Sequence, residues 1–395
     1  MTSATLIFGV PADNMPLFHR LPHPAHDPAA WVRLPDGSVT VMVRDVELAG
    51  VRALVSSGRL RADRVVCYED VLDPAERHPD RPVRAAQALR TICTAAAVRA
   101  VTADRSLNLL AVDELRNAGI EVVCDRDLGV LDRRRKSPAE VESLRAAQHA
   151  TERAVRLAAE MIWDAKPDAQ GILHDTQGVL TAERVHAAID TYLAQTNCAS
   201  DGHVVAPGPI GADCHAHGTG PIRTAEPVII DVFPKHRETG YHGDCTRTIF
   251  HGSPPPQLQR MLDTVARAKQ AAFDACRAGV TGAHVHNAVA QVITAAGYTL
   301  DFPDQSQLER ATKARTPTGF CSMPHGTGHG IGLELKEPPL LDPTGPQLLE
   351  GDAVTIEPGL YAPGLGGVRI EDLVIVRDTG VENLNTLPDL LTPNT

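Results

Sequence analysis

Four apolar segments in the second half of the chain each place an acidic residue inside or beside the run. They are Val228-Ile229-Ile230-Asp231, Asp244-Cys245-Thr246-Arg247, Val354-Thr355-Ile356-Glu357 and Val368-Arg369-Ile370-Glu371-Asp372. Their β-branched residues favour strands, and the spacing predicts two strand pairs: 227–233 with 244–250, and 353–357 with 368–376. An ionised carboxylate among buried apolar side chains is costly unless it is paired or bound to a cation. Any fold of this chain therefore has to compensate four such charges.

The chemistry of these acids depends on whether they converge. A single acid in a strand is most often explained by a salt bridge or by a strand end, but four acids in two hairpins repel each other if they meet. Two divalent cations supply counter-charge of the right size. A nitrogen ligand for such ions is available in Pro324-His325-Gly326-Thr327-Gly328-His329-Gly330-Ile331-Gly332.

The two histidines of this segment are four residues apart, as in a helical zinc-binding pair. The alternating glycines argue against a helix, and the glutamate of an HExxH motif is missing. A glycine-lined strand or loop instead lets a substrate approach the backbone while an imidazole projects inward. Four carboxylates and one imidazole suit Mn²⁺, Co²⁺, Fe²⁺ or Zn²⁺, and two such ions bridge a water and polarise a carbonyl.

Composition excludes several other classes of protein. Residues 1–136 hold 19 basic and 18 acidic side chains, net +1, and residues 137–395 hold 19 basic and 31 acidic, net −12. Neither part has the basic excess of a nucleic-acid-binding surface, so no nucleic-acid partner is expected. The chain has no apolar run long enough to predict a membrane span, and residues 1–8 lack the pattern of a secretory signal. Eight cysteines without a C-x-x-C pair predict free thiols and a cytoplasmic protein.

The first third of the chain alternates strand-like and helix-like segments. Strands are expected at 4–10, 38–44, 64–69, 97–103 and 120–124, and helices at 45–57, 82–96 and 105–118. The proline-rich span 11–37 is expected to be a loop. The alternation predicts a mixed α/β domain over residues 1–130, with a sheet of about five strands.

A second domain is expected over residues 131–395. Near its start lies the run Arg133-Arg134-Arg135-Lys136, which we interpret as a solvated linker and not as a nucleic-acid patch. The next four residues, Ser137-Pro138-Ala139-Glu140, carry the signature of a helix N-terminus, and this helix is expected to reach about residue 165. Further helices are expected at 181–195, 257–277 and 283–296. Long helices with paired strands predict an α+β domain built on antiparallel sheet.

The ordered set Asp231, Asp244, His329, Glu357 and Glu371 resembles the metal-ligand pattern of the pita-bread metallopeptidases, which include methionine aminopeptidase, prolidase and aminopeptidase P. The surrounding residues are similar too: Gly243-Asp244-Cys245-Thr246-Arg247-Thr248, His325-Gly326-Thr327-Gly328-His329-Gly330-Ile331-Gly332-Leu333, Thr355-Ile356-Glu357-Pro358-Gly359 and Gly366-Gly367-Val368-Arg369-Ile370-Glu371-Asp372. The resemblance covers about residues 130–395, and the preceding domain is similar to that of the prolidase, aminopeptidase P and creatinase branch. It implies an α+β protein in which an N-terminal mixed α/β creatinase-type domain (1–130) contacts substrate or a second subunit. A C-terminal catalytic pita-bread domain (131–395) with antiparallel sheet follows.

The resemblance implies a role for each ligand. Asp231 would bind one of two divalent metal ions, Asp244 and Glu371 would bridge both, and His329 and Glu357 would hold the other. Glu357 would also act as the general base for the bridging water. We expect Mn²⁺ first, with Co²⁺, Zn²⁺ or Fe²⁺ as alternatives.

Other residues would act on the substrate by the same resemblance. His325 would contact the substrate beside the metals, and Arg369 would orient Glu371 or relay protons. His215 is similar to the family's substrate histidine upstream of the first aspartate, although His217 could take its place. Exposed-loop or structural roles are the alternatives for these histidines.

The chain departs from the family at Lys336. The family has a histidine seven residues after the ligand histidine, where it hydrogen-bonds the scissile carbonyl or the developing oxyanion. This chain instead reads Leu333-Glu334-Leu335-Lys336-Glu337-Pro338-Pro339. A lysine can donate to an oxyanion or hold a peptide carboxylate, but its ammonium accepts no hydrogen bond. Altered specificity or rate is expected, with a weakened enzyme as the alternative.

The sequence thus predicts a cytoplasmic Xaa-Pro metallopeptidase, a prolidase or an aminopeptidase P, that acts on dipeptides or short proline-containing peptides. A peptide bond to proline lacks an N–H group, so a dedicated site is chemically sensible. A homodimer is expected by family analogy. One alternative is a pita-bread binding module that has lost catalysis and recognises peptides or a protein partner. The other is a metal-independent amidinohydrolase like creatinase, which the complete ligand set disfavours.

Overall fold

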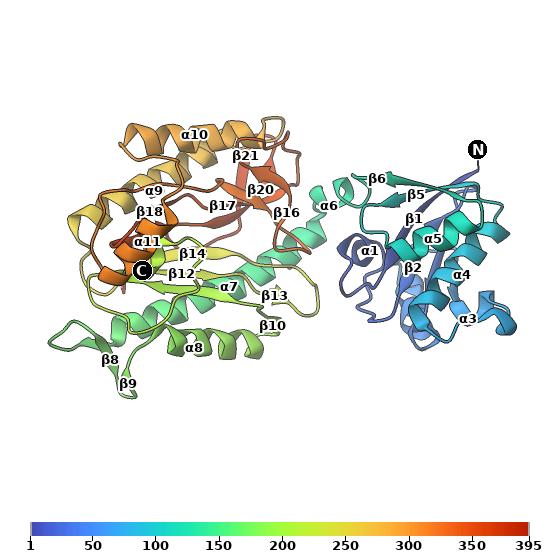
Figure 1. The fold of residues 1–395 in the computed structure, drawn as a ribbon, viewed down its shortest axis with the longest axis horizontal. Coiled ribbons are helices and arrows are strands. Elements are labelled where there is room, and N and C mark those ends of the chain that lie inside the picture. The colour runs from blue at the N-terminus through green and yellow to red at the C-terminus, as the bar shows by residue number, and fades with distance from the viewer. Residues whose placement is uncertain (1, 394–395) are drawn as a thin grey trace. The chain divides into compact units, whose positions relative to one another are not determined.

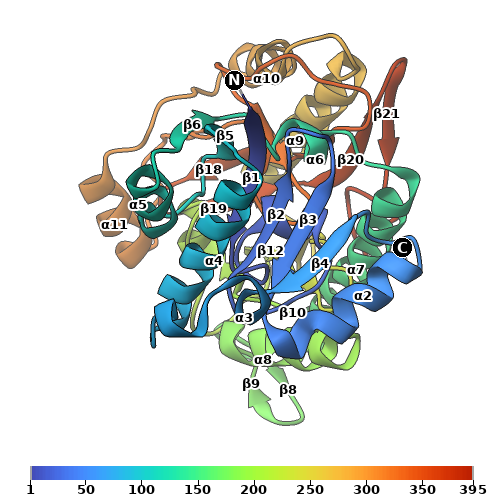
Figure 2. The same cartoon turned by 90° about the vertical axis from the view of Figure 1, so that its right-hand side faces the viewer.

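The computed structural model describes residues 2–393, and the chain divides into two compact units, Met1–Arg133 and Arg134–Thr395. The smaller unit is built on one six-stranded sheet in the order β4-β3-β2-β1-β5-β6. Its strands are β1 (Ser3–Gly9), β2 (Ala29–Arg33), β3 (Val39–Val43), β4 (Arg64–Cys67), β5 (Ala100–Asp104) and β6 (Glu121–Asp125). Strand β2 pairs antiparallel with both β1 and β3, whereas the pairs β3–β4, β1–β5 and β5–β6 are parallel. Figure 2 shows β1 to β4 side by side.

Helices cover both faces of this sheet because successive residues of a strand point to opposite sides. Leu6 and Phe8 pack with residues of α4 (Arg81–Ala95) and α5 (Leu109–Asn117), whereas Ile7 packs with residues of α1 (Met15–Arg20) and α2 (Leu48–Ser56). Short helical segments complete the unit: η1 (Asp45–Glu47), α3 (Tyr68–Val71), η2 (Pro74–Glu76) and, across the boundary, α6 (Leu131–Arg134).

The prediction of a loop over 11–37 is wrong, because the span contains α1 and β2. The side chain of Asn14 caps α1 by accepting a hydrogen bond from the backbone N–H of Leu17, and Pro16 lies in the first turn, where a missing N–H costs nothing. With β2 the sheet has six strands, where about five were expected.

The larger unit has one pair of helices on each side of its strands (Figure 1). Helices α7 (Pro138–Asp164) and α8 (Ala182–Gln195) pack on the sheet β11-β12-β14, and α9 (Pro256–Ala275) and α10 (Gly282–Ala295) share a core with β17, β19 and β20. The first sheet contains β11 (His203–Pro207), β12 (Pro227–Val232) and β14 (Cys245–Phe250). The second sheet has the order β16-β15-β17-β20-β21. Its strands are β15 (Gly328–Gly330), β16 (Glu337–Leu341), β17 (Ala353–Ile356), β20 (Asp372–Arg377) and β21 (Gly380–Asn383). A separate two-stranded sheet pairs β18 (Gly359–Ala362) with β19 (Gly366–Arg369).

Smaller elements are β7 (Lys166–Pro167), β8 (Leu173–Asp175), β9 (Gly178–Val179), β10 (Cys198–Ala199), η3 (Gly208–Ala212), β13 (Lys235–His236) and α11 (Gln305–Ala314). The helices expected at 181–195, 257–277 and 283–296 are confirmed to within two residues. The helix after Ser137 begins with the expected capping box, in which the side chains of Ser137 and Glu140 each accept from the other's backbone N–H. Within residues 2–393, no helix has the length and apolarity to cross a membrane.

Two expectations for this unit are wrong. The strand expected over 368–376 is divided at Ile370 and Glu371, so that β19 and β20 belong to different sheets. The basic run at 133–136 is not a solvated linker: Arg134 donates from Nε and Nη2 to the carboxylate of Asp352, at 2.8 and 2.6 Å. Lys136 Nζ lies 2.6 Å from Glu337 Oε1 in a second buried ion pair. Acids more than 200 residues away in the sequence neutralise these cations.

Candidate active site

The four acids singled out above lie at or beyond the ends of strands. In the β12–β14 hairpin Asp231 pairs with Thr246, and Asp244 immediately precedes β14, so both aspartates lie at the same end of the hairpin. Glu357 follows the last residue of β17, and Glu371 lies in the break between β19 and β20. At strand ends an acid can leave the apolar layer and face a cavity.

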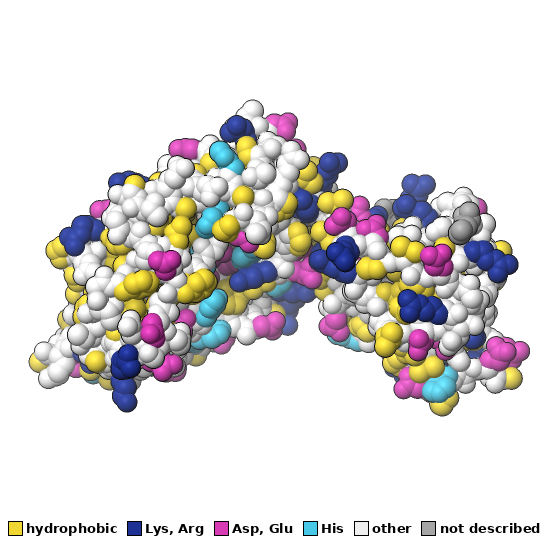
Figure 3. All heavy atoms as spheres, turned by 45° about the horizontal axis from the view of Figure 1, so that its top comes forward, with side chains coloured by type: hydrophobic (Ala, Val, Ile, Leu, Met, Phe, Trp, Pro, Cys, Tyr) yellow, Lys and Arg dark blue, Asp and Glu magenta, His cyan; other side chains and the backbone are white. Residues whose placement is uncertain are grey.

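A cavity of about 370 Å³ collects these side chains. It is lined by all five expected ligands (Asp231, Asp244, His329, Glu357 and Glu371), by all the other expected site residues (His215, His217, His325, Lys336 and Arg369), and by Val204, Cys214, Phe233, Gly326, Gly328, Leu335, Leu340 and Asp342. Histidine side chains gather at a hollow on the face of the larger unit drawn in Figure 3. The structure therefore brings together every residue for which the sequence predicted a role.

The closest group in the cavity contains Asp244, His329 and Glu371. One ligand atom from each lies within 4.8 Å of the others, and all three residues are buried. His329 Nε2 is 3.8 Å from Asp244 Oδ2 and 3.4 Å from Glu357 Oε1. His329 Nδ1 lies 3.0 Å from the carbonyl oxygen of Gly330, which assigns the ring proton to Nδ1 and leaves Nε2 as the acceptor facing the acids. Metal-binding histidines are commonly held in this way.

The glycines on either side of His329 make room for neighbouring strands. A Cβ atom on Gly328 would lie 2.0 Å from the carbonyl oxygen of Thr355 in β17, and one on Gly330 would lie 2.4 Å from that of Glu337 in β16. The alternation of glycine and histidine thus follows from the close approach of β15 to the strands on both sides.

Burial and mutual repulsion perturb the acids of the cavity. Burial, followed by the charges of neighbouring carboxylates, raises the pKa of Asp244 and of Glu371 well above its usual range, and burial also raises the pKa of Asp231. Burial acts in the same direction on Glu357, but His329 and other nearby basic groups outweigh it and lower its pKa. Burial lowers the pKa of His329, which favours the neutral ring that can bind a metal ion.

Arg369 contacts Asp231 directly and Glu371 only through a threonine. Its guanidinium donates from Nη2 to Asp231 Oδ2 at 2.6 Å, from Nη1 to the hydroxyl of Tyr361 at 2.8 Å and from Nε to Thr246 Oγ1 at 3.2 Å. Thr246 Oγ1 in turn donates to Glu371 Oε2 at 2.8 Å. The other oxygen of Asp231, Oδ1, is buried and has no hydrogen-bond partner among residues 2–393.

The three predicted substrate histidines have different surroundings. His325 Nδ1 lies 2.7 Å from the carbonyl oxygen of Gly326, and its Nε2 is 3.0 Å from the hydroxyl of Tyr361. His217 Nδ1 lies 3.2 Å from the carbonyl oxygen of His203. Both His215 and His217 line the cavity, so the choice between them stays a prediction.

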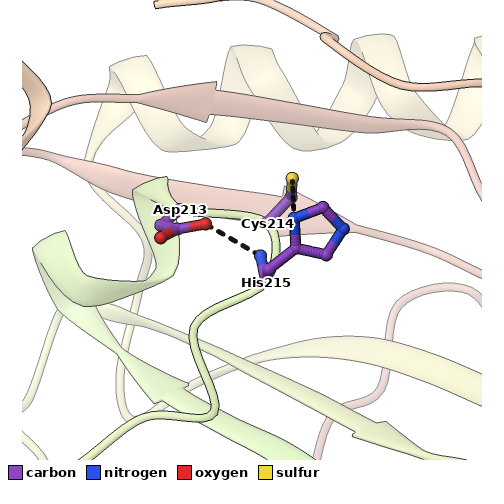
Figure 4. Close-up of side chains that lie close together, drawn as sticks. All are labelled: Asp213, Cys214 and His215. Carbon is purple, nitrogen blue, oxygen red and sulfur yellow. Dashed lines mark hydrogen bonds between the residues drawn. The ribbon is translucent and has the colours of Figure 1, made fainter. Parts of the chain in front are cut away.

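His215 belongs to a tight loop with the two residues before it (Figure 4). The backbone N–H of His215 donates to Asp213 Oδ1 at 2.9 Å, and its Nδ1 lies 3.8 Å from Cys214 Sγ. Ligand atoms of the three residues come within 4.8 Å of one another, but Asp213 and His215 are exposed, unlike the members of the buried group at Asp244.

Sequence reasoning missed a buried residue that holds Asp244 in place. Gln148, on the buried face of α7, donates from Nε2 to the carbonyl oxygen of Asp244 and accepts from its backbone N–H at Oε1, both at 2.8 Å. The available signal was a polar residue four positions after Leu144 on the apolar stripe of the helix.

Buried carboxylates around an imidazole, on paired sheets, form a group of side chains that could hold a metal ion. The sequence profile of metallopeptidase family M24 matches residues 142–378, and the chain belongs to this family. The family and fold predictions are thereby confirmed, and membership implies divalent metal ions.

Similar proteins and structures carry peptidase names. The chain is 34% identical over 227 residues to the "Probable dipeptidase PepE" of Mycobacterium tuberculosis, covering 52% of this chain and 54% of that protein. It is 30% identical over 254 residues to the "Xaa-Pro dipeptidase" of Pyrococcus furiosus, covering 63% and 62%. The match thus spans about half the length of PepE.

Solved structures extend the likeness to nearly the whole chain. The Xaa-Pro dipeptidase from Bacillus anthracis superposes with a TM-score of 0.76 at 21% identity, covering 98% of this chain and 94% of that one. Dipeptidase PepE from Mycobacterium ulcerans superposes with a TM-score of 0.72 at 26% identity, covering 99% and 92%.

Proposed function

We propose that the chain is an Xaa-Pro metallopeptidase that releases an N-terminal residue preceding proline from dipeptides or short peptides, using two divalent metal ions. The convergence of Asp231, Asp244, His329, Glu357 and Glu371 on one cavity carries the proposal. The names of the relatives support the reaction class.

The residues of the cavity fit divalent ions. Asp231 Oδ1 is a buried oxygen without a hydrogen-bond partner among the described residues, and His329 Nε2 faces the acids as a free acceptor. The pKa values of Asp244 and Glu371 are raised because burial and the neighbouring negative charges disfavour the ionised carboxylates. Bound cations would relieve both penalties. Carboxylate oxygens with one imidazole suit Mn²⁺, Co²⁺, Fe²⁺ or Zn²⁺, and we propose Mn²⁺ first.

The chain's own residues would divide the work around this site. Divalent ions would make a water nucleophilic near neutral pH and polarise the scissile carbonyl. Glu357 would accept the proton of that water, and Thr355 Oγ1 donates to its Oε1 at 3.1 Å, which helps to orient the carboxylate. Arg369 holds Asp231, and His325 offers an imidazole to the substrate beside the metal ligands.

The test uses the metal-stripped full chain reloaded with Mn²⁺, Co²⁺, Zn²⁺ or Fe²⁺, and counts the ions bound per chain by mass spectrometry. We expect two ions and metal-dependent hydrolysis of Ala-Pro or Ala-Pro-Ala, with Ala-Ala as the control peptide. Metal-loaded protein that cleaves neither proline peptide would overturn the proposal. If such protein still binds these peptides, the chain is the non-catalytic binding module that the lysine at position 336 allows.

Three further attributes are proposed with this function. A homodimer and a role for residues 1–130 in contacts with substrate or a second subunit rest on the family resemblance, and sedimentation of the purified chain tests the dimer. A cytoplasmic location is proposed from the cysteine pattern of the sequence, eight cysteines without a C-x-x-C pair. Fractionation of cells that express the full-length protein tests it.

A further inference from the structure

Lys336 lies beside the metal-ligand group on the wall of the cavity. In the pairing of β15 with β16, Gly330 is opposite Glu337 and His329 is opposite Leu340, so Lys336, the residue before β16, adjoins the strand that carries the ligand histidine. The side chain is exposed to the cavity.

The ammonium of Lys336 makes no hydrogen bond or ion pair within residues 2–393. The acid next to it in the sequence, Glu337, is buried, and its Oε1 lies 2.6 Å from Lys136 Nζ. The second cation of the cavity, Arg369, is committed to Asp231, Tyr361 and Thr246 through its three nitrogens. Lys336 is therefore the cation of the cavity wall that is available to a ligand.

Apolar side chains line the same cavity as this cation. Leu335 precedes it, Leu340 follows on β16, and Phe233 and Val204 line the same cavity. A wall of this kind accepts a small apolar ring, and a cation at its edge accepts a carboxylate. A C-terminal prolyl residue offers both groups, because its pyrrolidine ring is apolar and its carboxylate lies one residue beyond the scissile bond.

We propose that Lys336 is a specificity-determining residue that binds a substrate carboxylate on the leaving-group side of the scissile bond, and that it directs the enzyme to dipeptides with a free C-terminus. This proposal rests on the proposed function and adds to it the class of substrate. An acidic side chain following proline carries the same chemical group, so the experiment has to separate the two sources. A lysine that contacted only the developing oxyanion would assist every peptide equally.

The experiment compares kcat/KM of the metal-loaded full chain on Ala-Pro, Ala-Pro-amide and Ala-Pro-Asp-amide. We expect Ala-Pro to exceed Ala-Pro-amide by roughly 10-fold or more, as for loss of one charge-assisted hydrogen bond. Lys336→Met should reduce this ratio toward one, chiefly through KM for Ala-Pro, and Lys336→Arg should retain most of it. Lys166→Met, an exposed lysine of β7 outside the cavity lining, is the matched control and should leave the ratio unchanged.

Each outcome decides between the possibilities. An unchanged ratio in Lys336→Met, or an equal loss on Ala-Pro and its amide, overturns the carboxylate role. Preference for Ala-Pro-Asp-amide over Ala-Pro shows that an acidic side chain is recognised instead and overturns the assignment to the C-terminus. If no peptide is cleaved, the proposed function fails, and calorimetric binding of proline against prolinamide to wild type and Lys336→Met decides the role of Lys336 independently. Equal binding of the two by the wild type overturns it.

Discussion

The replacement Gln148→Met tests whether a buried helix residue sets the position of Asp244, a proposed metal ligand. Gln148 is completely buried, and its carboxamide satisfies both backbone groups of Asp244, at 2.8 Å each. Asp244 precedes β14, so these two groups have no partner in the sheet ladder. Methionine has a similar length and is apolar, and it would leave the N–H and the carbonyl buried without partners.

The magnitude follows from those two groups. An unsatisfied buried backbone group costs about 1–3 kcal/mol, so Gln148→Met should lower the free energy of unfolding by about 2–6 kcal/mol, and by less if water enters. Released from the carboxamide, Asp244 would shift relative to His329 and Glu371. Loss of a residue that supports a metal ligand typically weakens metal binding about 10–100-fold.

The assay has two readouts on the same protein: denaturant unfolding of the metal-free chain, and Co²⁺ affinity measured by competition with a chelator. Gln291→Met on α10 is the matched control, because Gln291 is exposed and its carboxamide makes no hydrogen bond within residues 2–393. If Gln148→Met matches this control in both stability and Co²⁺ affinity, the carboxamide does not position Asp244 and the reasoning is refuted.

Three further predictions concern charge. Glu357→Gln should retain the fold and lower kcat by about 10²–10⁴-fold if the carboxylate is the general base; circular dichroism and peptide turnover check it, and near-normal turnover contradicts it. Arg134→Met leaves the fully buried carboxylate of Asp352 without its bidentate partner and should cost about 3–5 kcal/mol in denaturant unfolding, whereas a loss under 1 kcal/mol would mean that water screens this pair. The pKa values of Asp244 and Glu371 are raised in the metal-free folded chain, so these carboxyls keep their protons at pH values where the unfolded chain, with ordinary pKa values near 4, has released them. Stability of the metal-free chain is therefore lost as the pH rises through the pKa values of the folded state. The stabilisation that Mn²⁺ confers should therefore grow from pH 5 to pH 8 in thermal unfolding, and a pH-independent increment would contradict this.

The elements that local sequence signals specify were predicted well. The helix after Ser137 carries its own capping box, and its buried residues recur at helical spacing over 27 residues. The acids at 231, 244, 357 and 371 were predictable as a group because each interrupts an apolar run, and such an interruption requires compensation wherever the strands are placed. These features needed no knowledge of distant partners.

The errors arose where a residue's state depends on a partner far along the chain. From the sequence alone Arg134 belongs to a basic run that predicts a solvated segment. In the folded chain it pairs with Asp352, 218 residues away. Ile370 continues an apolar alternation, and nothing local shows that the chain leaves one sheet for another at that point. Gln148 looks like an ordinary interruption of a helix stripe until Asp244 meets it.

The neighbours Glu371 and Asp372 show how a proposed metal ligand differs from a structural acid in this fold. Both are almost fully buried, and burial acts to raise the pKa of each. Asp372 receives Arg247 Nη2 at 2.7 Å and the ammonium of Lys269, and these cations outweigh burial and lower its pKa. Glu371, the preceding residue, lines the cavity, and within residues 2–393 the hydroxyl of Thr246 is the only side-chain donor to its carboxylate. Burial and the neighbouring carboxylates keep its pKa raised. Cations of the chain pair with Asp372, whereas no cationic side chain within residues 2–393 forms an ion pair with Glu371. The sequence of two adjacent acids does not contain this difference.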